Sequence, residues 1–328
     1  MNLKILKYTA LVVFALLWLP GFSPNVARWL AQKGFVKDEY RYGDLYRFSN
    51  LAQFRVPNQQ CVPAPVKVTS PNTALYLIGD SFTEPARMTA ADFKTGTFQR
   101  FFIGDTSFIK LDRTKKNILI IETVERHFRE RFAQPYTNLV TGKPSTRQAA
   151  RKMLLNARDV FWYSTERHEA VLFSSDFFLK IKEWKAGLNE TFFNRTDSHV
   201  VLSADKKRIF FEMDARPDGI TSSFDRVSDS EISRLVENVN RTYDFYKKNG
   251  FDEVYLSIAP NKSSVLGKDL GNYNRLIERV QQHPGLKAPY FDIYTPFSSS
   301  KKMLYDVGDT HWNCEGKQIW LDAVNDKL

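Results

Sequence analysis

Two short motifs, far apart in the chain, contain residue types that together can carry out nucleophilic catalysis. The first is Gly-Asp-Ser-Phe at 79–82, and the second is Asp-Thr-His-Trp-Asn at 309–313. A serine hydroxyl is a weak nucleophile, so it needs a base within hydrogen-bond reach and a third group that orients this base. The motifs therefore predict a triad in which Ser81 is the nucleophile, His311 the base and Asp309 the orienting acid.

The spacing within the second motif fits these roles. Asp309 and His311 are separated by one residue, so in an extended loop both side chains project to the same side. The carboxylate can then reach one ring nitrogen while the other nitrogen faces Ser81. A Gly-Asp-Ser sequence also occurs in ordinary turns, and many histidines are structural. From these residues alone, that simpler interpretation stays open.

A metal site is the other chemistry that this region suggests. Asp309, His311 and Cys314 lie close together in sequence and are all possible ligands. No second Cys/His cluster accompanies them, and Cys61 is too far away to complete a familiar ligand spacing. We therefore expect neither a metal nor a cofactor.

A strand is expected to position the serine. The apolar run 74–78 is typical of a buried strand, and Thr83-Glu84-Pro85 after Ser81 is typical of a helix start. Ser81 would then lie at the carboxyl end of a strand, the edge where open α/β sheets bind ligands, beside the amides of a helix. Near the other end of the chain, Asn313 is expected to cap a terminal helix.

The rest of the folded part alternates strand and helix patterns. This alternation predicts an α/β fold with three layers and a mainly parallel central sheet. A mid-chain insertion at about 134–221 is expected to interrupt it. The expected elements are strands at 98–103, 117–121, 254–258 and 290–293, helices at 122–132, 146–157, 176–185, 232–246 and 273–281, and a hairpin at 199–212.

The amino terminus has the pattern of a membrane-targeting segment. Lys4 and Lys7 precede an apolar run at 8–19, without a convincing small-x-small cleavage site. The segment approaches the length needed to span a bilayer, so we expect an uncleaved signal anchor over 1–27 and a juxtamembrane connector over 28–72. The basic flank predicts a single-pass inner-membrane protein with its folded part in the periplasm. A cleaved signal peptide and secretion to the periplasm is the alternative.

The chain has two cysteines, and export makes a disulfide between them possible. Cys61 follows the expected connector's first half, and Cys314 lies beside His311. A bond would clip the connector onto the histidine loop. Without it, each cysteine is simply a small apolar residue, and the sequence leaves both options open.

Composition indicates one globular unit with appendages. The chain has 328 residues, is 43% hydrophobic and carries a formal charge of +10. In a cytoplasmic protein this charge would favour nucleic-acid binding, which the expected export excludes. Basic clusters at 143–152 and 180–185 could instead contact an anionic polysaccharide or lipid headgroups, or be solvated surface.

Four motifs in order resemble those of the SGNH (GDSL-type) hydrolase superfamily, and most closely its alginate O-acetyltransferase-like branch. They are the Gly-Asp-Ser-Phe motif, the Asp-x-His-Trp motif with Gly316, the helix start from Glu122 to Arg126, and the Pro-x-Lys loop at 260–262. The resemblance covers about 73–328. It implies an SGNH/flavodoxin-like fold and acetyl transfer through Ser81 to hydroxyls of an exported polysaccharide.

The resemblance also implies a partner. Such proteins often work beside a membrane-bound O-acyltransferase that brings acetyl groups across the membrane, and this chain has one span and no acetyl-CoA motif. Two alternatives keep the same fold. One is an acetyl esterase that uses the same triad, and the other is a non-catalytic polysaccharide-binding subunit.

The donors for an oxyanion are the least determined part of the expected site. Common SGNH hydrolases carry a Gly-x-Asn-Asp block after the third strand, whereas this chain has Glu122 there, and a carboxylate donates no hydrogen bond unless it is protonated. We expect the Ser81 amide, and Asn261 or Lys262, to serve instead. Glu122 and Arg126 lie one helical turn apart and could pair with each other or with Lys262, or form a buried structural ion pair.

Overall fold

The computed structural model describes residues 3–37, 40–62, 65–142 and 163–328. By its contacts the chain divides into two compact units. We call 1–57 together with 144–196 the helical unit, and 58–143 together with 197–328 the sheet unit. The expected connector at 28–72 and the expected insertion at 134–221 each contribute to both units. The helix expected at 146–157 lies outside the described residues.

The sheet unit is built on five parallel strands, which confirms the α/β prediction. Their spatial order is β2-β1-β4-β8-β9. Chain order reverses between β1 and β4, and doubly wound sheets bind ligands in the crevice at such a reversal. The strands are β1 (Ser70–Gly79), β2 (Thr95–Phe102), β4 (Lys116–Val124), β8 (Glu253–Ala259) and β9 (Tyr290–Phe291).

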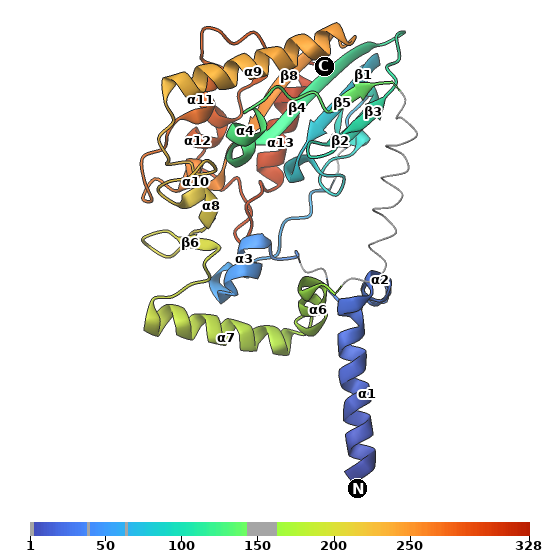
Figure 1. Ribbon diagram of the computed structural model, residues 1–328, viewed down its shortest axis with the longest axis vertical. Helices are drawn as coiled ribbons and strands as arrows, with labels where there is room; N and C mark the ends of the chain where they lie inside the picture. The colour runs from blue at the N-terminus through green and yellow to red at the C-terminus, as the bar shows by residue number, and fades with distance from the viewer. Residues whose placement is uncertain (1–2, 38–39, 63–64, 143–162) are drawn as a thin grey trace. The chain divides into compact units, whose positions relative to one another are not determined.

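Both faces of this sheet are buried because side chains alternate along each strand. In β1, Tyr76 and Ile78 pack into a core with α9 (Asp229–Lys248) and α11 (Leu276–Gln281). Leu75 and Leu77 pack into the opposite core, to which α12 (Tyr294–Ser299) and α13 (Cys314–Asn325) contribute. The result is the expected three-layer arrangement, which can be followed in Figure 1.

Smaller elements complete the sheet unit. The expected hairpin is confirmed as the antiparallel pair β6 (Val200–Leu202) and β7 (Ile209–Phe211). Asn313 caps α13 as expected, because its side chain accepts hydrogen bonds from two amides of the first turn. The remaining elements are η2 (Ser81–Thr83), η3 (Ala90–Asp92), the parallel pair β3 (Ser107–Ile109) and β5 (Leu139–Thr141), α4 (Glu125–Arg131), α8 (Glu212–Ala215) and α10 (Lys262–Leu266).

One expected element near Ser81 differs. The segment that was predicted to start a helix forms only the short 3-10 turn η2, and Glu84 after it is extended, with φ −60° and ψ 159°. The ring of Pro85 disfavours the helical conformation of the residue before it. The chain therefore leaves the helical region at Glu84, and Ser81 has a single turn after it rather than a helix.

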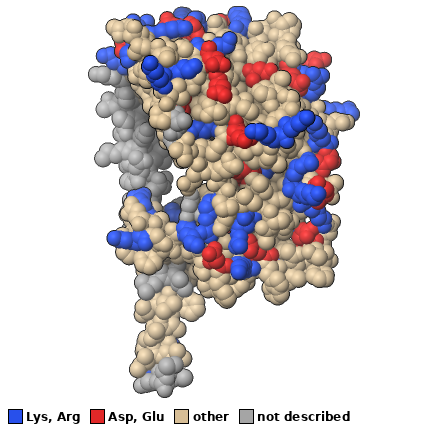
Figure 2. All heavy atoms as spheres, turned by 180° about the vertical axis from the view of Figure 1, so that it is seen from behind, with Lys and Arg blue, Asp and Glu red and all other residues tan. Residues whose placement is uncertain are grey.

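The helical unit contains the amino-terminal helix and several further helices. Residues Lys4–Phe22 of α1 have a mean hydropathy of 1.8, long and apolar enough for a membrane anchor or a signal sequence. In Figure 2 the described part of α1 is almost entirely tan. The elements are α1 (Leu3–Phe22), α2 (Pro24–Gln32), α3 (Asp44–Ser49), η1 (Ala52–Phe54), α6 (Thr165–Leu172) and α7 (Asp176–Phe193).

Candidate catalytic site

The structure brings Ser81, His311 and Asp309 together in the order that a triad requires. Ser81 Oγ lies 2.8 Å from His311 Nε2, and His311 Nδ1 lies 2.7 Å from Asp309 Oδ1. Both distances are those of good hydrogen bonds. Ser81 is exposed, whereas His311 and Asp309 are 6% and 2% exposed. A reagent from solution can therefore reach the hydroxyl while the base and the acid stay shielded.

The environment of Asp309 keeps it ionised. Burial alone would raise the pKa of this carboxyl, but the neighbouring His311 and Arg87 outweigh burial and hold the pKa well below its usual range. Arg87 Nη2 lies 3.8 Å from Asp309 Oδ2. The same oxygen accepts a hydrogen bond of 2.6 Å from Asn58 Nδ2. Asp309 is thus a carboxylate that can stabilise a positive charge on His311.

A network centred on Asp80 fixes the turn that carries Ser81. Asp80 accepts hydrogen bonds from the amides of Phe82 and Val124 and from the Arg131 guanidinium. Its own amide donates to Glu122 Oε2 at 3.0 Å. The turn is therefore tied to the end of β4, the neighbouring strand, so Ser81 is held at the edge of the sheet where the strand order reverses.

Gly79 is required because other groups approach its backbone closely. A Cβ atom at this position would lie 2.0 Å from Thr83 Oγ1 and 2.8 Å from Glu122 Oε2. Thr83 Oγ1 donates to that same Glu122 oxygen at 2.9 Å. Any side chain at residue 79 would separate these partners, which accounts for the glycine in the motif.

Glu122 supports the nucleophile turn and is buried beneath it. It is fully buried, and burial together with the negative charge of Asp80 raises its pKa well above the usual value. The expected pairing of Glu122 with Arg126 or Lys262 is not the one found, because its Oε2 is bound to Asp80 and Thr83. Glu122 therefore holds the turn that carries Ser81, and this role accounts for its place in the expected motif.

Arg126 has a different partner from the one expected. Its guanidinium lies 2.5 Å from Asp214 Oδ2, and both side chains are buried. Burial raises the pKa of Asp214 to about 6, although Arg126 opposes this shift. The alternative of a buried structural ion pair is therefore the correct description of Arg126, with an acid from α8 that the sequence did not single out.

The Pro-x-Lys loop positions the histidine loop rather than offering donors to a ligand. Lys262 Nζ donates to the carbonyl oxygens of Asp306, Val307 and Asp309 at 2.8–3.0 Å. These three bonds occupy all its hydrogens when it is protonated. Burial lowers the pKa of Lys262 to about 7, while the charges of Asp309 and Asp306 oppose this. Lys262 therefore braces the backbone just before His311.

Asn261 is also committed to internal bonds. It is 1% exposed, its Oδ1 accepts from the Arg126 amide and its Nδ2 donates to Ser223 Oγ. Neither Asn261 nor Lys262 is thus placed as an oxyanion donor. The Ser81 amide has no hydrogen-bond partner among the described residues, so of the three expected donors it is the one left available.

Aromatic packing brings the two motifs together. The ring of Phe82 lies 4.7 Å from that of His311 and 4.9 Å from that of Trp312, measured between centroids. Phe82 and Trp312 are both buried. Gly316 allows the start of α13 to pack closely, because a Cβ there would meet the Leu304 carbonyl oxygen at 2.5 Å. The aromatic residues of both motifs therefore set the distance between Ser81 and His311.

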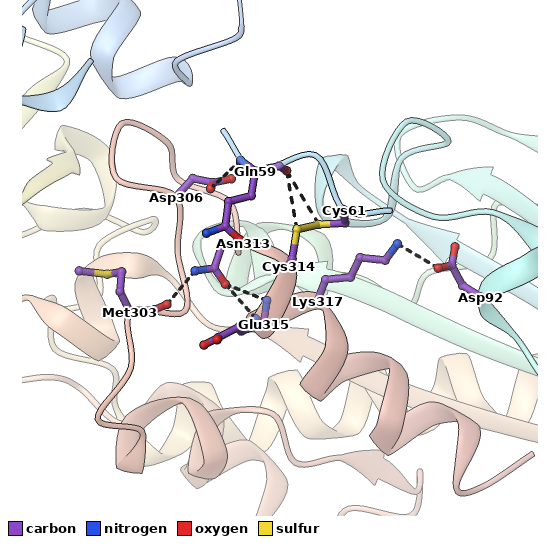
Figure 3. The surroundings of a disulfide bond; sticks show 10 residues. Gln59, Cys61, Asp92, Met303, Asp306, Asn313, Cys314, Glu315 and Lys317 are labelled. Atoms are coloured by element: carbon purple, nitrogen blue, oxygen red, sulfur yellow. Dashed lines mark hydrogen bonds and ion pairs between the residues drawn. A yellow bond between two sulfur atoms is a disulfide. The ribbon is translucent and has the colours of Figure 1, made fainter. Parts of the chain in front are cut away.

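The two cysteines are joined, which resolves the alternatives left open by the sequence. Cys61 and Cys314 form a disulfide across a sequence separation of 253. Figure 3 shows the segment from Gln59 to Cys61 beside the start of α13. The Gln59 amide also donates to Asp306 Oδ1 at 3.2 Å. We call residues 58–61 the strap. The disulfide leaves no Cys314 thiolate for the metal site considered above.

Two important residues were not found from the sequence. Asp80 lies inside the first motif, and its position between glycine and serine suits a turn that accepts amides. Asn58 lies in no motif at all. Asn58 could have been placed near the site only from the disulfide, because a residue three positions from Cys61 must lie within about 10 Å of Cys61.

Comparison with known proteins adds no relative to this picture. No protein-family model, no curated protein and no solved structure matches the chain. The geometry of the site and its place on a parallel α/β sheet are therefore the observations on which a function has to be argued.

Proposed function

We propose that this chain is a membrane-anchored O-acetyltransferase of the SGNH type, which acts on hydroxyls of an exported polysaccharide. The single observation that carries the proposal is the pair of hydrogen bonds from Ser81 through His311 to Asp309, at 2.8 and 2.7 Å. Three further features support it. The site lies at the reversal point of a parallel sheet, residues of all four motifs of the resemblance take part in its packing and hydrogen bonds, and α1 suits an anchor.

The chemistry divides into two steps. Ser81 Oγ attacks the carbonyl carbon of an acetyl ester, His311 Nε2 takes the hydroxyl proton, and the alcohol of the donor leaves after His311 returns that proton to it. The product is acetyl-Ser81. A sugar hydroxyl then attacks this ester while His311 accepts its proton, and the proton returns to Ser81 Oγ as the bond breaks. Asp309 remains ionised and stabilises the imidazolium in both steps.

The backbone amide of Ser81 can assist both steps. Charge develops on the acetyl oxygen in each tetrahedral intermediate, and backbone amides aimed at that oxygen stabilise it. The Ser81 amide is the donor that we assign to this role. The acetyl donor would be delivered by a membrane-bound O-acyltransferase. With α1 as an inner-membrane anchor, the sheet unit would work in the periplasm.

An acetyl esterase is a second candidate, and one observation favours it. The Ser81 side chain is exposed to solvent in the described chain, so water can reach an acyl-serine as readily as a sugar can. Transfer and hydrolysis share the first step and differ only in the acceptor. The experiment must therefore separate formation of the acetyl-serine from its discharge.

Intact mass spectrometry of the full chain in detergent, after mixing with an activated acetate ester, tests the proposal. We expect one added acetyl group on Ser81 in the parent and none in Ser81→Ala or His311→Ala. Asp309→Asn should acylate about 10⁴-fold more slowly, because the imidazole loses its orienting carboxylate. Ser81 is exposed, so Ser81→Ala should unfold at nearly the same temperature as the parent.

The second stage decides between the two activities. Faster loss of the acetyl group with added oligosaccharide than with buffer alone would establish transfer, and equal loss would establish an esterase. Equal acetylation of the parent and Ser81→Ala would contradict the triad itself. If neither the parent nor any variant forms the acetyl adduct, the proposal of an enzyme that works without its membrane partner is rejected.

A further inference from the structure

Helix α7 carries a row of large apolar side chains on its solvent side. Phe177, Ile181, Trp184, Leu188 and Phe192 follow one another at intervals of four, three, four and four residues. At about 100° per residue these positions lie on one face of a helix. We call them the α7 stripe. Phe177, Ile181, Trp184 and Phe192 are 67%, 49%, 71% and 73% exposed, and Leu188 is half-buried.

The stripe is not the face by which α7 packs. The packed face is the opposite one, where Leu179 and Glu183 are buried. Glu183 accepts a hydrogen bond of 2.9 Å from the Tyr46 hydroxyl and pairs with Arg55 at 3.3 Å. All these contacts lie within the helical unit. The helix is therefore fixed in orientation by its polar contacts, with its most apolar face directed outwards.

An exposed apolar row of this size needs an occupant. Soluble monomers rarely expose large contiguous apolar patches, and such patches mark an interaction site for protein or membrane. The aromatic content points to a bilayer interface, since tryptophan and phenylalanine are favoured where hydrocarbon meets headgroups. Lys180 and Lys185 are exposed and flank the stripe on its two sides, as in helices that lie on anionic lipid.

The position of α7 in the chain gives the second argument. Three residues separate the end of α6 from the start of α7, and α6 contacts α1. Ser164, which caps α6, donates its amide to the Gly21 carbonyl at 2.8 Å. Trp18 of α1 stacks on Tyr163 with ring centroids 5.7 Å apart. Within the helical unit, α7 is thus linked to the end of a helix that can cross a membrane.

From these observations we infer that the α7 stripe binds the surface of the same lipid bilayer that α1 enters. The helix lies in the interface, with the stripe among the acyl chains and Lys180 and Lys185 at the level of anionic phosphates. Such binding gives the helical unit a second attachment and fixes its orientation about α1. This binding requires no acyl chemistry, so the inference does not depend on the function proposed above.

Quenching of Trp184 fluorescence by lipids tests this inference. The full chain is reconstituted into vesicles of phosphatidylcholine and phosphatidylglycerol, with or without bromine on the acyl chains. The contribution of Trp184 is the parent spectrum minus that of Trp184→Phe, which keeps an aromatic residue in the stripe. We expect brominated lipid to remove at least half of this contribution, and aqueous iodide to remove little.

A pair of matched variants tests the stripe as a whole. Ile181→Glu places a carboxylate in the middle of the stripe, and Asn189→Glu adds the same charge to an exposed position beside it. We expect Ile181→Glu to lose more than half of the lipid quenching of Trp184 and Asn189→Glu to retain it. Both side chains are exposed, so far-ultraviolet circular dichroism should be unchanged in both variants.

Each other result would overturn the inference. Quenching of Trp184 by iodide but not by brominated lipid would mean that the stripe faces water. Resistance to both quenchers would mean that protein covers the stripe, either another part of this chain or a second copy. Equal lipid quenching in Ile181→Glu and the parent would show that the apolar row does not hold the helix at the bilayer.

Discussion

At the scale of single residues, Asp309 is held by hydrogen bonds on both of its carboxylate oxygens. One oxygen of Asp309 faces His311, and the other accepts the hydrogen bond from Asn58 at 2.6 Å. A buried carboxylate with both oxygens occupied has a fixed orientation, and hydrogen bonds to charged groups stabilise a protein by about 1.5–3 kcal/mol. Asn58 is therefore a positioning residue that acts on His311 through Asp309.

Substitution of Asn58 tests whether it positions His311 through Asp309. We expect Asn58→Ala to lower kcat for ester cleavage about 10- to 100-fold with little change in KM, because Asp309 orients His311 less well while the acyl donor still binds. Asn58→Asp should lower kcat further, since its carboxylate would face that of Asp309. Steady-state kinetics with an activated acetate ester measures both.

The neighbouring residues supply the control for Asn58. Gln60→Ala changes an exposed side chain two positions along the same strap and should leave kcat unchanged. Equal kcat in Asn58→Ala and the parent would show that Arg87 and His311 alone orient Asp309. A rise in KM without a fall in kcat would place Asn58 in substrate binding instead.

The candidate catalytic residues were predictable from the sequence, while several of the residues that hold them were not. Serine, histidine and aspartate have few roles in such motifs, so Ser81, His311 and Asp309 could be identified with their expected contacts. Hydrogen bonds to a carboxylate have no comparable sequence pattern, because any amide brought close by the fold can donate them. That is why Asn58, and Asp214 as the partner of Arg126, emerge only from the structure.

At the scale of elements, the strap is held by the bond between Cys61 and Cys314. It runs beside the loop that carries Asp309 and His311, and the disulfide attaches it to the first residue of α13. Closing so long a stretch of chain restricts the unfolded state strongly in the chain-entropy model, although the measured gain is typically 2–4 kcal/mol. The bond thus contributes both stability and the placement of Asn58.

Removal of the disulfide should therefore mimic loss of Asn58. We expect Cys61→Ala to lower kcat about 10-fold and the free energy of unfolding by about 2–4 kcal/mol. In the double variant with Asn58→Ala, kcat should fall little further, because the strap no longer presents Asn58 in either case. The double-mutant cycle on kcat, together with urea unfolding of each protein, measures both effects.

Independent effects would contradict this coupling. If the reductions in kcat from Cys61→Ala and Asn58→Ala multiply in the double variant, the strap keeps its position without the disulfide. Cys314→Ala serves as the matched variant, since it breaks the same bond from the other side and should reproduce the kinetics of Cys61→Ala.

Long buried strands were the most predictable elements, because their apolar runs leave few alternatives. The run at 74–78 lies inside β1, and the run at 117–121 lies inside β4. The helix expected after Ser81 failed for a local reason, since Pro85 acts on the residue before it. The division of 28–72 and 134–221 between two units could not be predicted, because it depends on contacts between distant segments.

At the scale of the whole molecule, several buried acids near the site have raised pKa values. Burial is the largest cause in each case, and it raises the pKa of Glu125 to about 7 and those of Asp214 and Asp306 to about 6. In the unfolded chain these groups titrate near their ordinary values of about 4. Between about pH 4 and pH 7 these three groups therefore bind more protons in the folded state than in the unfolded state.

The sign of the resulting pH dependence follows from linkage. A group with a raised folded pKa contributes stability that is fully present below its unfolded pKa and is lost as the pH rises through its folded pKa. Asp309 does not alter this trend, because its lowered pKa matters only below about pH 4. Lys262, with a pKa lowered to about 7, raises stability with pH only above that value.

The free energy of unfolding should accordingly be higher at about pH 5 than at about pH 7, and Glu125 should account for a large part of the difference. The rise in the pKa of Glu125 corresponds to a change on the order of 3 kcal/mol in the free energy of unfolding. Glu125→Gln keeps an oxygen to accept the hydrogen bond from the Asn261 amide, yet it cannot ionise. We expect urea midpoints of Glu125→Gln to fall less across this range than those of the parent, and to exceed them at about pH 7.

Glu237→Gln, at an exposed position on α9, should follow the parent at every pH. Parallel curves for Glu125→Gln and the parent would mean that Glu125 is ionised in the folded protein throughout this range, with Arg126 or a hydrogen bond offsetting its burial.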